Sequence, residues 1–451
     1  MEIDIKVVEL TLLQFSVIVK LNVAECPKGG NYRMLIRKRL TMLLFFVILG
    51  SIAVGCSGGR KAASGPAPTK APEAVPTEAP AATATPTPTP SPTPTLVPID
   101  YKTAVLKDIY ADYFTVGGVL GGTGMNNPSV YGIITTHFNS VTMENEMKPN
   151  SLLDYMTSIS DPKYDDSPAI NYSNLDTCLK FAQDKGLKMR GHTLVWHSQT
   201  PRWLFTEGYS MQADAPFVTK ELMLKRMENY IRQVLEYCQT KYPGIVYAWD
   251  VVNEAIEIGN GHPEGLRTQG SYWYTIIGDD FVEKAFEYAR KYADPEVKLF
   301  YNDYGTENSL KASAIKKLVA KIQEQGNIDG IGLQTHIGID SPSLSDIDST
   351  ARSLAELGLE LQVTELDMNM PTNTEENLAK QGTRYKRLFI YFKKWVEDGI
   401  KLTNVTFWGT TDDRSWLNKA NAPSYPLLFD KNFEKKPAYY GVLQDPEVRL
   451  Y

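Results

Sequence analysis

"LQVTELDM", residues 361–368, has most of the composition of a buried β-strand, with leucine, valine and methionine side chains that suit a core. Two carboxylates, Glu365 and Asp367, interrupt that pattern. Because burial of an unpaired carboxylate is strongly unfavourable, we expect the strand to leave the core at this point. Both acidic side chains would then lie at its carboxyl end.

Seven other apolar runs with strand composition alternate along the chain with amphipathic helix patterns. The eight candidate strands are residues 113–120, 137–143, 187–196, 244–252, 297–302, 330–336, 359–366 and 404–409. The helix pattern is clearest at 225–242 and 385–400. Eight alternations in about 350 residues predict an α/β fold, a (β/α)8 TIM barrel over residues 98–451, whose chemistry lies where the strands end.

The segment before the barrel contains an export signal. Residues 1–33 are an extension of doubtful status that precedes Met34, and we assign them no function. Residues 34–56 contain a basic stretch, an apolar run and a small residue before Cys56, which is the layout of a signal peptide. The end of this segment resembles the lipobox of bacterial lipoproteins, which implies lipidation of Cys56 and an extracellular protein held at the bacterial cell surface. Ordinary signal cleavage with secretion, or a retained anchor helix, remains open.

Residues 57–97 form a Pro/Thr/Ala-rich tract with almost no large apolar side chain to bury. We therefore expect a disordered linker. In polyproline geometry it reaches roughly 120 Å, which is enough to hold the barrel away from a membrane surface. We expect the membrane to be contacted only through a lipid on Cys56.

Composition narrows the class of ligand. The chain has 47 Lys and Arg against 53 Asp and Glu, a formal net charge of −6, so capture of nucleic acid is not expected. The 4 cysteines show no zinc-binding spacing, and we expect no metal and no cofactor. The 25 tyrosines, 16 phenylalanines and 7 tryptophans supply flat faces of the kind against which sugar rings pack. A neutral ligand and a monomer are the expectation.

Polar residues that do not suit a strand recur where the predicted strands end. They are, in chain order, Glu144, Asn145, Lys148, His192, Trp196, His197, Gln199, Asn253, Glu254, Asn302, Tyr304, Gln334, His336, Glu365, Asp367, Trp408 and Trp416. Taken singly, such a carboxylate is usually a cap or an ion-pair partner, and such a histidine is usually structural. Their recurrence at seven strand ends predicts one site at one mouth of the barrel.

Glu254 and Glu365 come from separate strands and have aromatic neighbours, which suits glycoside hydrolysis. In that reaction one carboxyl protonates the leaving oxygen while the other meets the anomeric carbon. Asn253 could donate to a sugar 2-hydroxyl, and either His336 or Tyr304 could keep the second carboxylate ionised. The residues alone leave open which glutamate takes which role.

The motifs "ENEMKP", "GHTLVWHSQ", "WDVVNEA", "FYNDY", "GLQTH", "VTELD" and "DDRSWL" occur in this order. Because these motifs are present, residues 105–442 resemble glycoside hydrolase family 10, the β-1,4-xylanase family. The resemblance implies endo-hydrolysis of β-1,4 linkages in xylan and xylooligosaccharides with retention of configuration. It also implies that Glu365 is the nucleophile and Glu254 the acid/base.

The same resemblance assigns the other positions. Substrate-binding roles are implied for Glu144, Asn145, Lys148, Trp196 and Gln199 on the glycone side, for His192, Asn253, Gln334, His336 and Trp408 around the attacked sugar, and for Tyr304 and the roof residue Trp416. Asn302 and Asp367 are expected to support the site, Asp367 through the histidine network. The glycine-rich loop at 119–127 departs from the family pattern.

Other classes of protein remain to be weighed. A metal-dependent barrel hydrolase could use His192 and His336, but the HxH spacing expected of its ligands on one strand is absent. A surface lipoprotein that binds polysaccharide without cutting it would not need both Glu254 and Glu365. A cellulase is the alternative within the glycosidases.

Overall fold

The computed structural model describes residues 99–450. The predicted signal, linker and lipidation at Cys56 fall within residues 1–98 and lie outside the described residues. Within the described range, no helix has both the length and the apolar composition needed to cross a bilayer.

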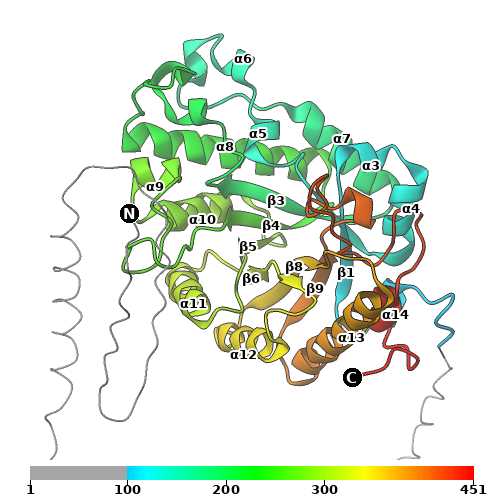
Figure 1. Ribbon diagram of the computed structural model, residues 1–451. Helices are drawn as coiled ribbons and strands as arrows, with labels where there is room; N and C mark the ends of the chain where they lie inside the picture. Colours follow the sequence, from blue (N-terminus) through cyan, green and yellow to red (C-terminus); the bar gives the residue numbers. More distant parts are fainter. Residues whose placement is uncertain (1–98, 451) are drawn as a thin grey trace, which may run out of the picture. The chain divides into compact units, whose positions relative to one another are not determined.

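One sheet of parallel strands forms the centre of the fold (Figure 1). The strands are β1 (Thr115–Leu120), β2 (Ser140–Met143), β3 (Lys188–Trp196), β4 (Val246–Asn253), β5 (Lys298–Asp303), β6 (Gly330–Leu333), β7 (His336–Gly338), β8 (Glu360–Asn369) and β9 (Leu402–Phe407). Their order is β6-β5-β4-β3-β2-β1-β9-β8-β7, and pairing of β6 with β8 closes the sheet. Because β7 pairs only with β8, the other strands make a closed barrel of eight, and the predicted (β/α)8 fold is confirmed.

Helices surround the barrel (Figure 1). The longer ones are α4 (Pro128–His137), α7 (Tyr172–Asp184), α8 (Lys220–Lys241), α10 (Phe281–Tyr292), α11 (Ser309–Glu324), α12 (Leu344–Ala355) and α13 (Glu375–Glu397). Short helices are α2 (Leu106–Ile109), α3 (Gly122–Met125), α5 (Pro149–Leu152), α6 (Tyr155–Ser158), α9 (Tyr272–Ile277) and α14 (Pro437–Val442). The predicted helices at 225–242 and 385–400 are parts of α8 and α13. Thr219 and Thr374 cap their N-termini by accepting from backbone N–H groups three residues on.

The sixth predicted strand is shorter than expected. It ends at Leu333, and Thr335 has a positive φ of 61°, which turns the chain out of the ladder. His336 therefore begins the separate strand β7, where it pairs in register with Asp367 of β8. The prediction that His336 ends the sixth barrel strand is wrong in this detail, but the turn places His336 directly beside the two carboxylates of β8.

A charged pair lies buried inside the barrel. The guanidinium of Arg190 on β3 donates two hydrogen bonds, of 2.8 and 2.7 Å, to the carboxylate of Asp250 on β4. Its Nε donates to Gln362 on β8 at 2.6 Å. Arg190 and Asp250 are at most 1% exposed, so each neutralises a charge that would otherwise be very costly in the interior. These bonds tie three strands together below the mouth.

Gly330 at the start of β6 leaves room for a neighbouring ring. A Cβ at this position would collide with the ring of Phe300 on β5 and would lie 2.7 Å from the carbonyl oxygen of Glu360. Gly132 on α4 is the opposite case, because nothing lies within 4 Å of the Cβ position there.

We expect Gly330→Ala to destabilise the barrel by about 1–3 kcal/mol through overpacking. Gly132→Ala should stabilise it by about 0.5–1 kcal/mol, because alanine is the better residue inside a helix. Differential scanning calorimetry of both variants measures this. Equal unfolding temperatures for the two variants would show that the strand spacing at Gly330 is not tight.

Candidate active site

Glu254 follows β4 directly and is oriented by neutral donors. Its Oε2 accepts from Trp196 Nε1 at 3.0 Å, and its Oε1 accepts from Gln334 Nε2 at 3.1 Å and Asn253 Nδ2 at 3.2 Å. Its backbone has a positive φ of 57°, which is rare for a residue with a side chain. The carboxyl group is thus held in one direction, across the mouth of the barrel.

Glu365 lies on β8 and is 5% exposed. Its Oε1 accepts from Asn302 Nδ2 at 2.7 Å, and its Oε2 lies 3.2 Å from His336 Nε2. Burial opposes ionisation of Glu365, but the hydrogen bond from His336 and the Coulombic effects of His192 and His336 outweigh it and hold the pKa below its usual value. Glu365 is therefore a buried carboxylate that remains charged.

His336 lies between two carboxylates. Its Nε2 faces Glu365, and its Nδ1 lies 3.0 Å from Asp367 Oδ1. Burial favours the neutral ring, yet the charges of Asp367 and Glu365 dominate and raise the pKa of His336 to about 10. Trp416 Nε1 donates to the other oxygen of Asp367 at 2.8 Å. A cationic imidazolium thus pairs with Glu365 and is itself held from behind.

A row of amide side chains connects the two glutamates. Asn302 donates from Nδ2 both to Glu365 and, at 2.9 Å, to Asn253 Oδ1. Asn253 in turn donates to Glu254, and Thr364 fixes Asn302 by donating to its Oδ1 at 2.6 Å. With both hydrogens of the Asn302 amide in use, the separation of the two carboxyl groups is fixed by the protein.

The residues predicted for the glycone side gather at the end of β2. Lys148 Nζ donates to Asn145 Oδ1 at 3.2 Å and lies 4.9 Å from the centre of the Trp196 ring. Burial lowers the pKa of Lys148 and raises that of Glu144. Gln199 is exposed, with a positive φ of 45°. Their free donors and acceptors suit the hydroxyl groups of a sugar.

Two tryptophans cover this region. A cavity of about 300 Å³ is lined by Glu144, Trp408 and Trp416 together with the glycine-rich loop. The ring of Trp408 meets His192 edge-on, with centroids 5.3 Å apart, and Trp416 meets His336 at 5.1 Å. The structure therefore brings the predicted roof residues against the predicted histidines and beside Glu144.

Tyr304 bonds to residues other than the two predicted catalytic glutamates. Its hydroxyl donates to Glu257 Oε2 at 2.8 Å and accepts from Arg267 at 3.0 Å. Of the two alternatives for keeping the second carboxylate ionised, Tyr304 is therefore wrong for Glu365, and His336 is the residue that contacts it.

Sequence reasoning missed the partners below the mouth. His192 Nδ1 lies 2.9 Å from Asp250 Oδ2, and Arg190 donates to both oxygens of that carboxylate. Burial raises the pKa of Asp250, but the charge of Arg190 outweighs it and keeps the pKa below its usual value. The available signal was a charged residue in the middle of an apolar strand, which requires an opposite charge nearby.

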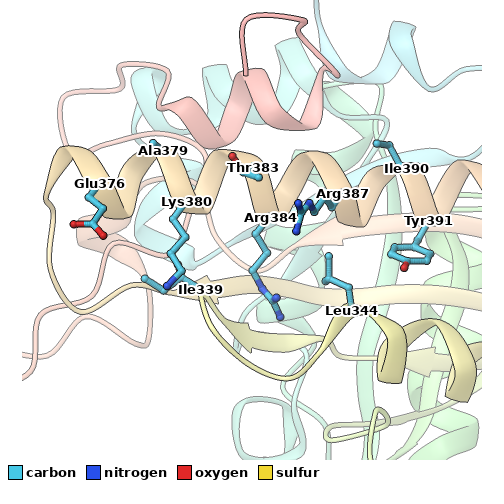
Figure 2. A pocket seen from close by; sticks show the side chains of 10 residues that line it. All are labelled: Ile339, Leu344, Glu376, Ala379, Lys380, Thr383, Arg384, Arg387, Ile390 and Tyr391. Carbon is cyan, nitrogen blue, oxygen red and sulfur yellow. The ribbon is translucent and has the colours of Figure 1, made fainter. Parts of the chain in front are cut away.

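Other candidate sites are separate from this one. Among residues 99–450, no three His, Cys, Asp or Glu side chains are grouped as metal ligands. A cavity of about 870 Å³ lies between α13 and residues 339–344 (Figure 2). Lys380 pairs there with Asp340, and Arg384 donates to the carbonyl oxygen of Pro342. None of the predicted site residues lines it.

Comparison with known proteins places this geometry in a family. Residues 105–445 match the family described as Glycosyl hydrolase family 10. Endo-1,4-beta-xylanase B of Butyrivibrio fibrisolvens is 41% identical over 343 residues, which cover 75% of this chain and 53% of that protein. An exoglucanase of Acetivibrio thermocellus is 40% identical over 351 residues, covering 76% of this chain and 30% of its own length. The chain thus spans about half or less of these relatives.

Solved structures agree in fold. An intracellular xylanase of Thermoanaerobacterium saccharolyticum, a Glu-to-Ala variant in complex with xylotetraose, is 39% identical with a TM-score of 0.65. The match covers 75% of this chain and 97% of that one.

We expect the pKa of Glu365 to lie below the usual value of a glutamate and to rise in His336→Gln, because glutamine keeps a donor but not the positive charge. A carboxyl with a lowered pKa keeps its charge until the pH falls through that value, so the variant loses the charge at higher pH. Carbon-13 NMR titration of labelled glutamate measures this, with assignment from Glu365→Gln. His137→Gln, a buried histidine packed against Tyr439, is the control. An unchanged or lower pKa in His336→Gln would contradict the imidazolium.

Proposed function

The chain belongs to Glycosyl hydrolase family 10, and on that basis we propose that it is an endo-β-1,4-xylanase that cuts xylan by a retaining double displacement. The observation that carries the proposal is the pair of unequally held glutamates at the mouth of the barrel. Glu365 pairs with an imidazolium, whereas Glu254 is held by neutral donors.

We propose that Glu365 is the nucleophile. Retaining glycosidases need an ionised carboxylate that forms a covalent glycosyl-enzyme, and Glu365 stays ionised for the reasons given above. Its Oε1 is fixed by Asn302 and its Oε2 by His336, so attack on the anomeric carbon needs little reorganisation. In retaining sites the two carboxyl groups lie ~5–5.5 Å apart.

Glu254 then acts as the acid and afterwards as the base. It first protonates the leaving oxygen and later takes a proton from the water that opens the glycosyl-enzyme. Asn253 and Gln334 orient Glu254, and we propose that they also bond the hydroxyl groups of the attacked sugar.

We propose xylan as the substrate because xylose lacks the hydroxymethyl group of glucose. Trp408 and Trp416 line the cavity beside Glu144, and we propose that their rings exclude a hydroxymethyl group from the bound sugar. Steric exclusion of this kind favours xylose over glucose by about 1–3 kcal/mol. Relatives named endo-xylanases support xylan, and the relative named an exoglucanase keeps cellulose as the second candidate.

We expect Glu365→Ala to lose activity on every substrate. Glu254→Ala should keep the first step on dinitrophenyl β-xylobioside, whose leaving group needs no proton, and azide should speed its turnover by attacking the glycosyl-enzyme. Glu264→Ala, which removes an exposed partner of Lys321, is the control and should behave as wild type. If both active-site variants were equally inactive and neither responded to azide, the assigned roles would be wrong.

Trp408→Ala should narrow the preference for xylo- over gluco-configured aryl glycosides, because it weakens binding of the first and relieves the clash with the second. The kcat/KM values on both substrates measure this, with reducing sugar released from xylan and carboxymethyl-cellulose alongside. A wild-type kcat/KM that is equal or higher on the gluco substrate would favour the cellulase.

We also propose that the barrel is exported and anchored through Cys56, on the sequence pattern of residues 34–56. A single acyl chain binds membranes weakly, so a modification with more than one chain is expected. Palmitate labelling should disappear in Cys56→Ser and persist in Cys26→Ser. Labelling that survives Cys56→Ser would contradict anchoring at this residue, and enzyme free in the medium with another N-terminus would indicate plain secretion.

A further inference from the structure

The backbone of Glu254 has an unusual conformation. Its φ of 57° lies in the left-handed region, which residues with a side chain adopt only when the surroundings hold them there. Because the direction of a side chain follows from its backbone, relaxation at this residue would move the carboxyl group away from Trp196 and Gln334.

Arg267 bonds to the peptide group that joins Glu254 to Ala255. Its Nε donates to the carbonyl oxygen of Glu254 at 3.1 Å. Its NH2 group donates to Glu257 at 2.6 Å and to the hydroxyl of Tyr304 at 3.0 Å. The Arg267 side chain is only 15% exposed, so these bonds are largely shielded from water.

The preceding peptide group, between Asn253 and Glu254, is held by β5. The backbone N–H of Glu254 donates to the carbonyl oxygen of Asn302 at 2.9 Å. The loop from Glu254 to Arg267 is also closed on itself, because Arg267 N donates to Ala255 O and Glu257 N donates to Gly265 O, both at 2.7 Å. Arg267 is therefore the side chain that fixes the carbonyl half of the strained residue.

We propose that Arg267 is a positioning residue for the acid/base Glu254. The proposal rests on the proposed function. Without the bond from Nε, the Glu254 peptide relaxes and the carboxyl group no longer points at the leaving oxygen. Glu365 keeps its own partners Asn302 and His336, because Arg267 bonds to neither of them. Removal of this bond should therefore slow proton transfer to the leaving group and leave nucleophilic attack unchanged.

Arg267→Met tests this, with dinitrophenyl and phenyl β-xylobiosides as substrates. Proton donation by a positioned acid contributes typically 10²–10⁴-fold, so loss of positioning should lower kcat/KM on the phenyl substrate by roughly 10- to 100-fold. On the dinitrophenyl substrate, kcat/KM should stay within about threefold of wild type, because that leaving group needs no proton. Azide should raise kcat on it, as in Glu254→Ala.

Two further variants separate positioning from general damage. Arg232→Met removes an arginine that pairs with Glu236 on the surface of α8 and should match wild type on both substrates. Arg267→Lys keeps the charge but cannot bond Glu254, Glu257 and Tyr304 together. It should therefore show the same split between substrates, a loss of kcat/KM on the phenyl but not on the dinitrophenyl xylobioside, to a smaller degree. If Arg267→Met does not fold, Arg267→Lys carries the test.

An equal loss on both substrates, or no loss on either, would overturn the inference. Wild type and Glu254→Ala are measured in parallel. A wild type that is inactive on both substrates would reject the proposed function instead. An active wild type, with the split present in Glu254→Ala and absent in the Arg267 variants, would reject the role of Arg267 alone.

Discussion

The site depends on one ion pair, the contact between the His336 imidazolium and the Glu365 carboxylate. Glu365 is almost completely buried, and an isolated carboxylate in such a place would take up a proton. His336 keeps its own proton because Asp367 lies on its far side. The charges therefore alternate along β7 and β8, and the register of these two strands sets the charge state of Glu365.

Glu254 is held mainly by hydrogen bonds that fix the direction of its side chain and not by a positive charge. Trp196, Asn253 and Gln334 orient Glu254 without adding positive charge, and its own backbone is held in a strained conformation. Asn302 ties the two halves together, since its side chain bonds to Glu365 and its carbonyl oxygen accepts from the backbone of Glu254. Glu254 and Glu365 are thus joined through Asn302 but are held by different interactions.

The sequence predicted the barrel because apolar runs and helix patterns alternate regularly, and it predicted the site because the ends of parallel strands meet at one mouth. It could not show the turn at Thr335, which depends on a single backbone angle and moves His336 onto its own strand. The pairing of Arg190 with Asp250 was also missed, because a strand pattern does not say which neighbour a buried charge meets. Arg267 gave no signal, since it contacts Glu254 only after the loop has folded back.

The most direct test of the central claim is to trap the covalent intermediate. A 2-deoxy-2-fluoro-xylobioside with an activated leaving group slows both steps, but the leaving group still allows the first, so the glycosyl-enzyme accumulates. Mass spectrometry of the digested protein then locates the sugar. We expect it on the peptide that contains Glu365, linked through that side chain. A label on another residue, or no label on a protein that hydrolyses xylan with inversion, would contradict the assignment of Glu365 as nucleophile.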